Sequence, residues 1–179
     1  QREQKLLRLR DTFSKWSKEH DRMAPLAEQG AQQFETTNEA FERFRRVLDG
    51  KLETGEITYS RYLGTAEQAY LAVLDNLEEV MLLLRSIDIE DLTYIEQQLG
   101  RHGKNATTLT ERKEVYDHQL ATAEQLLVAN EEALTDMQKT IAAITTMKTH
   151  GGAAIVDLET VRQELAELAQ RASLFSAHK

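Results

Sequence analysis

The strongest constraint on the fold is a series of mostly apolar or small residues spaced alternately three and four positions apart. The series continues without a break from Leu6 to Leu48. Because this spacing brings every member to one side of an α-helix, it predicts a long helix that packs along its whole length. The members are Leu6, Leu9, Phe13, Trp16, His20, Met23, Ala27, Gly30, Phe34, Thr37, Phe41, Phe44 and Leu48.

Pro25 lies inside this series, and proline both lacks a backbone donor and crowds the preceding helical turn. The spacing nevertheless continues through Pro25 without a shift in phase. We therefore expect a kink in a continuous helix over residues 2–49 rather than a reversal of the chain. Gly50 follows, and glycine readily adopts the left-handed conformation that ends many helices.

The remaining sequence repeats the helical spacing in four further segments. Asp88 has the side chain of a helix N-cap, and Thr108 with Glu111 has the spacing of a capping box. No segment alternates apolar and polar residues as a half-buried strand would. The sequence therefore predicts an all-α fold. The predicted segments are residues 59–87, 89–100, 108–149 and 154–177.

Short connections between long helices favour antiparallel neighbours. We therefore expect residues 1–179 to form a single elongated helical-bundle domain. Its architecture would be an up-down antiparallel helical bundle or coiled coil, with three to four long helices and one short capping helix over 89–100.

Charge and cysteine content exclude several classes of protein. The formal net charge of −8 argues against general nucleic-acid binding, because contacts to phosphates need a basic surface. The absence of cysteine excludes disulfides and thiolate metal sites.

The amino-terminal segment differs in charge from the rest of the chain. Residues 1–22 carry seven Lys or Arg residues against four acidic ones. This excess fits either a solvated helix face or a segment near an anionic membrane surface. No stretch reaches the roughly 20 apolar residues of a transmembrane helix. Because Gln1 stands inside a helical pattern, we expect a trimmed soluble part of a longer protein, either cytoplasmic or membrane-tethered.

The sequence contains no recognisable catalytic motif: it has no nucleophile elbow, no P-loop and no dinucleotide-binding glycine pattern. No histidine follows a glutamate by three positions, so the Glu-x-x-His pattern of di-iron bundles is missing. Glu114, Asp117 and His118 lie at helical spacing, which fits solvated charges as well as a small metal cluster. We therefore expect a non-enzymatic protein without a cofactor or metal.

Two sets of residues are candidates for special roles inside the helices. Asn130 lies in the apolar series between Leu127 and Leu134, where a buried amide fixes helix register at a cost in stability. The alternative role for Asn130 is ligand binding. His20, Ala27 and Gly30 lie in the apolar series on either side of Pro25. The small residues Ala27 and Gly30 allow either close helix packing or a pocket, and His20 is either a partly buried, hydrogen-bonded histidine or a ligand-binding or pH-sensing residue.

Residues 55–64 depart most from generic helical-bundle sequence. Tyr59, Arg61 and Tyr62 follow a turn there, and Tyr and Arg are enriched in binding hot spots. The competing interpretation is that the tyrosines fill the last core layer while Arg61 pairs with Glu53 or Glu56.

These observations favour a structural or protein-interaction module, and we expect it to be the soluble part of a membrane-anchored bacterial protein. It would bind a protein partner, itself or both, with no nucleic acid and no small-molecule substrate, and its amino-terminal end would lie near a membrane. The alternative is a sensory helical bundle that binds a small ligand between its helices.

Overall fold

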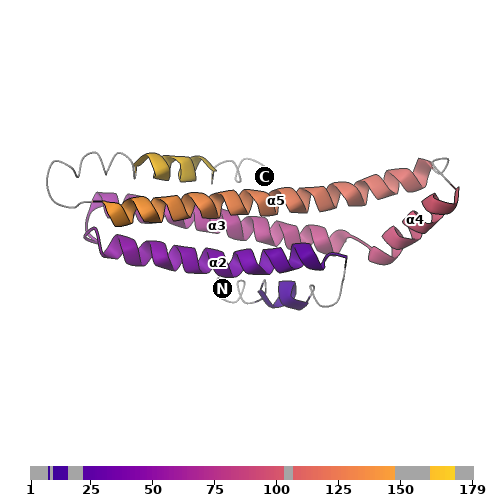
Figure 1. The fold of residues 1–179 in the computed structure, drawn as a ribbon, viewed down its shortest axis with the longest axis horizontal. Coiled ribbons are helices and arrows are strands. Elements are labelled where there is room, and N and C mark those ends of the chain that lie inside the picture. The colour runs from indigo at the N-terminus through magenta and orange to yellow at the C-terminus, as the bar shows by residue number, and fades with distance from the viewer. Residues whose placement is uncertain (1–7, 9, 16–21, 103–106, 148–161, 172–179) are drawn as a thin grey trace. The chain divides into compact units, whose positions relative to one another are not determined.

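The structure is a computed structural model that describes residues 8, 10–15, 22–102, 107–147 and 162–171. Every regular element in these ranges is a helix and none is a strand, which confirms the all-α prediction. Two shorter helical stretches cover residues 10–15 and 162–171. The four helices with full bounds are α2 (Ala24–Asp49), α3 (Ile57–Ser86), α4 (Ile89–His102) and α5 (Thr107–Thr146) (Figure 1).

The bounds of α3, α4 and α5 agree closely with the predicted segments. The predicted N-cap of α4 is present, because a side-chain oxygen of Asp88 accepts the Asp91 amide at 3.0 Å. Of the predicted last helix, residues 162–171 are helical and the rest lies outside the described residues.

The prediction of a continuous first helix through Pro25 is wrong. Arg22 and Met23 form a turn, and α2 begins only at Ala24. Pro25 is therefore in the first turn of α2, where a backbone N–H has no partner inside the helix and its loss costs little.

The position of Phe13 shows that the chain reverses before α2. A Cβ atom built on Gly30 would lie 2.6 Å from Cε1 of Phe13, so the ring lies directly against the Gly30 backbone. The two residues are 17 positions apart, which would separate them by about 25 Å in one straight helix. The regular spacing arose because both helical segments turn an apolar face toward the same core.

The chain divides into two compact units. Unit 1 contains residues Gln1–Ala31 and Leu77–Val128, and unit 2 contains Gln32–Asn76 and Ala129–Lys179. Helices α2, α3 and α5 each contribute residues to both units. The predicted single domain over residues 1–179 stays a prediction.

The core of unit 1 is built from apolar side chains of every helix that enters it. Helix α4 contributes two consecutive turns of its inward face, as its helical spacing predicts. The buried residues include Phe13, Met23, Ala27, Leu77, Val80, Leu84, Leu92, Ile95, Ala123 and Leu127.

The core of unit 2 joins the carboxy-terminal part of α2 to α3, α5 and residues 162–171. The rings of Phe41 and Tyr70 stack with their centroids 4.7 Å apart, and the Tyr70 hydroxyl donates to Asn38 at 2.7 Å. These contacts fix α2 against α3. The buried residues include Phe34, Phe44, Leu48, Ala66, Val73, Met137, Ile144, Leu165 and Leu168.

Candidate functional site

The start of α3 contains the residues that the sequence predicts as a partner-binding surface. Tyr59 and Tyr62 are buried, with 9% and 4% of their surface exposed, whereas Arg61 is exposed. Of the three residues, only Arg61 therefore has an exposed side chain. The two tyrosines instead fill the core below it, as the competing interpretation expects.

Tyr59 is held in place by a strong hydrogen bond. Its hydroxyl donates to Oδ1 of Asp49 at 2.6 Å, and this bond raises the pKa of Tyr59 above its ordinary value. Because Asp49 is the last residue of α2, the contact joins the end of α2 to the start of α3. The hydrogen bond therefore anchors the first turn of α3, next to Arg61.

The predicted pairing of Arg61 with Glu53 or Glu56 does not occur. Glu56 Oε1 instead accepts the backbone N–H of Glu53 at 3.1 Å. Among the described residues, no carboxylate forms an ion pair with Arg61.

Ile57 is a surface residue that the sequence analysis missed. It is 83% exposed, and it precedes Arg61 by one helical turn, so the two side chains are neighbours on the surface of α3. One feature of the sequence could have identified this surface. Ile57 lies outside the apolar series, and so does Arg61 four positions later.

A half-open pocket lies beside Arg61 in unit 2. Its volume is about 170 Å³, and it separates the amino-terminal part of α3 from the helix over residues 162–171. The sequence predicts neither this pocket nor a role for Arg162, because only the fold brings these two helices together. The lining residues are Arg61, Tyr62, Thr65, Arg162, Leu165, Ala166 and Ala169.

Asn130 lies in a layer of buried amides that joins three helices of unit 2. Asn76 of α3 donates to Asn130 Oδ1 at 2.9 Å, and Asn130 donates to Gln33 Oε1 of α2 at 3.1 Å. Gln33 in turn donates to Glu131 at 2.8 Å. Asn130 is fully buried, and its side-chain oxygen and nitrogen are both occupied by protein partners. This arrangement suits a residue that sets helix register better than one that awaits a ligand.

The residues proposed for a pocket near Pro25 do not come together as a described site. Ala27 is fully buried, and the ring of Phe13 fills the space beside Gly30. His20 lies outside the described residues. A pocket that includes His20 therefore stays a prediction.

Two groups of charged residues in unit 1 are paired with each other and do not form an open site. Asp91 accepts hydrogen bonds from Arg112 and from the Tyr116 hydroxyl, and Arg22 donates to both oxygens of Glu96 at 2.8 and 2.7 Å. Hydrogen bonds from the arginines lower the pKa of Asp91 and of Glu96. Carboxylates held ionised in this way are poor proton donors near neutral pH. The contacts of Asp91 link α4 to α5, and Arg22 links the turn before α2 to α4.

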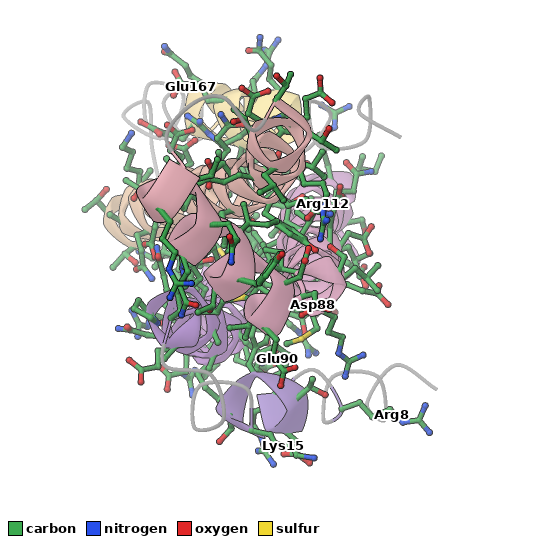
Figure 2. All side chains as sticks on the ribbon, turned by 90° about the vertical axis from the view of Figure 1, so that its right-hand side faces the viewer. Arg8, Lys15, Asp88, Glu90, Arg112 and Glu167 are labelled. Carbon is green, nitrogen blue, oxygen red and sulfur yellow. The ribbon has the colours of Figure 1, made fainter. Side chains whose placement is uncertain are left out.

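The basic amino-terminal segment is described only in part. Figure 2 shows the side chains of Arg8 and Lys15 directed outward, and both residues are exposed. None of the described helices combines the length and the apolar character that crossing a bilayer requires.

No group of three or more histidine and acidic residues in the described ranges is arranged to hold a metal ion. Asp117, one of the three residues considered for a metal cluster, pairs with Lys113 at 2.6 Å.

Comparisons with known proteins leave the chain without a family. No protein-family model matches it, and neither a curated protein nor a solved structure matches at a significant level.

Proposed function

We propose that this chain is a non-catalytic protein-interaction module that binds its partner, or a second copy of itself, through the start of α3. The observation that carries the proposal is the exposed pair of Ile57 and Arg61 above the buried Tyr59 and Tyr62. An exposed isoleucine alone is ordinary on a protein surface. Here the isoleucine lies beside an exposed arginine, above two buried tyrosines. The two exposed side chains together offer an apolar and a cationic contact in one place, and arginine is enriched in binding hot spots.

The combined substitution Ile57→Asp and Arg61→Ala tests this proposal in the full chain. Both side chains are exposed, so helicity should be unchanged while association weakens. Sedimentation velocity over a range of concentrations measures self-association. Quantitative mass spectrometry of proteins captured from the native cell extract measures partner binding.

Leu82→Asp with Arg85→Ala is the matched control, because it removes an exposed apolar and an exposed cationic residue elsewhere on α3. The control should behave as the unmodified chain does. Equal sedimentation and equal capture by both variants would refute the proposed surface.

We also propose that the helices form an elongated up-down antiparallel bundle, with α4 as the capping helix. Hydrogen bonds inside unit 2 support this arrangement: α2 pairs with α3 in opposite directions through Asp49–Tyr59 and Asn38–Tyr70. Small-angle X-ray scattering should give a maximum dimension well above that of a sphere of 20.4 kDa. A compact scattering profile would contradict the elongated shape.

A further inference from the structure

The half-open pocket of unit 2 combines an apolar wall with two arginine residues from different helices. Arg61 comes from α3, and Arg162 comes from the helix over residues 162–171, drawn in yellow in Figure 1. The wall between them is formed by the Tyr62 side chain and by Leu165, Ala166 and Ala169. Among the residues that the structure describes, no acidic one lines the pocket.

The size of the pocket restricts its occupant. An apolar cavity of about 150 Å³ in another protein is large enough for benzene. The pocket of about 170 Å³ therefore accommodates a body of one ring or a short acyl chain. Tyr62 and Leu165 are almost fully buried, so the apolar wall is held in position by the surrounding core.

The charge of the pocket restricts its occupant further. A guanidinium has five N–H donors, so an arginine that already has one partner can still donate to another group. Carboxylates accept such bonds strongly, often in pairs. In a chain with a net charge of −8, two arginines around one apolar pocket make a local site for an anion.

We propose that this pocket binds a small organic carboxylate with a single ring or a short acyl chain. The apolar body would lie against Tyr62, Leu165 and Ala169, and the carboxylate would accept hydrogen bonds from Arg61 and Arg162. The pocket shares Arg61 with the proposed protein-interaction surface but does not include Ile57, so substitutions at Ala169 and at Ile57 test the two proposals separately.

Isothermal titration calorimetry of the full chain with benzoate tests the proposal. We expect saturable binding at one site. Acetate, which lacks the apolar body, and benzyl alcohol, which lacks the charge, should each bind at least about tenfold more weakly. Loss of charge-assisted hydrogen bonds predicts a similar weakening for the double substitution Arg61→Gln and Arg162→Gln.

The matched control is Arg45→Gln with Arg46→Gln, which removes the same charge from exposed positions of α2 in unit 2. This variant should bind benzoate as the unmodified chain does. A third variant, Ala169→Leu, fills the pocket without changing its charge and should abolish binding. Circular dichroism checks that each variant retains its helices.

Four results would overturn the proposal. The first is no saturable benzoate binding, and the second is equal affinity for acetate, which would indicate only diffuse attraction to positive charge. The third is unchanged affinity in the folded Arg61→Gln and Arg162→Gln variant. The fourth is unchanged affinity in folded Ala169→Leu, which would place benzoate elsewhere.

The two proposals fail separately. Association of the Ile57 and Arg61 variant tests the protein-interaction surface, whereas benzoate binding by Ala169→Leu tests the pocket alone.

Discussion

The ring of Phe13 packs directly on the backbone of Gly30, so closely that a Cβ atom at position 30 would lie 2.6 Å from the ring. Both residues are buried in unit 1. This contact explains why a glycine occupies the interior of α2, where most other residues would favour the helix more.

Gly30→Ala should therefore destabilise the protein although alanine is the better helix former. The added methyl group meets the body of a fully buried ring, and overpacking of this kind costs about 1–3 kcal/mol, which exceeds the roughly 1 kcal/mol that the helix gains. Urea unfolding followed by circular dichroism measures the free energy of unfolding.

Gly64→Ala is the matched control for this substitution. A Cβ atom at Gly64, inside α3, would meet nothing within 4 Å. This variant should gain up to about 1 kcal/mol from helix propensity. If Gly30→Ala stabilises the protein as Gly64→Ala does, then Phe13 does not pack against α2.

Asn130→Leu tests the buried amide layer. From the sequence alone, an isolated amide in the apolar series suggests that leucine would raise stability. The structure reverses this expectation, because leucine would leave Asn76 and Gln33 buried without one of their partners. An unsatisfied buried polar group costs about 1–3 kcal/mol, so the melting temperature should fall.

The double substitution Asn76→Leu with Asn130→Leu distinguishes the loss of amide hydrogen bonds from the steric effect of the added leucine. It removes both partners of one hydrogen bond, so its cost should be smaller than the sum of the two single costs. Strict additivity of the two free-energy changes would mean that the amides do not interact.

The sequence predicted the type and the bounds of α3, α4 and α5 because their apolar spacing and capping residues are local signals. It also predicted that Asn130 lies in the apolar series. It could not show that Gln33 and Asn76 would meet Asn130, since they are 97 and 54 positions away from it, respectively. The same limit explains the error at Pro25: spacing shows which face of a helix is buried, and it cannot distinguish one long helix from two that share a core.

The candidate site was predictable only in part. Tyr59, Arg61 and Tyr62 do stand together at the start of α3, but residue type alone did not reveal that the tyrosines are buried. The second half of the pocket comes from residues 162–171, about 100 positions later in the chain. Such a pairing depends on tertiary packing, which helical spacing does not specify.

Arg171→Ala should loosen the helix over residues 162–171. Arg171 donates to Asp136 at 2.5 Å and to Glu132 at 2.5 Å, and Asp136 is only 3% exposed. Its loss leaves Asp136 with Lys139 as its cation, at 3.3 Å. Weakening the interactions of a buried carboxylate costs about 1–3 kcal/mol. Hydrogen exchange of the amides in residues 162–171 should accelerate more than that in α3.

Glu132→Ala is the control for the loss of Arg171, because it removes only the exposed half of the same contact. Exposed ion pairs contribute about 0–1 kcal/mol, so exchange over residues 162–171 should change little. If both substitutions accelerate exchange equally, the buried Asp136 is not what holds this helix.

Asp91→Asn should remove a pH-dependent part of the stability of unit 1. The pKa of Asp91 is lowered in the folded protein, first by the hydrogen bond from Arg112 and further by the one from Tyr116. A carboxyl group whose pKa is lower in the folded than in the unfolded chain stabilises the fold at pH values above its unfolded pKa, about 3.8. This stabilisation is lost as the pH falls through the folded pKa.

The unmodified chain should therefore melt at a higher temperature than Asp91→Asn at neutral pH, and the difference in melting temperature should shrink steadily below about pH 4. Glu79→Gln, at an exposed position of α3, is the control for the loss of one acidic side chain. A melting difference between Asp91→Asn and the unmodified chain that stays constant down to pH 2 would mean that ionised Asp91 does not link α4 to α5.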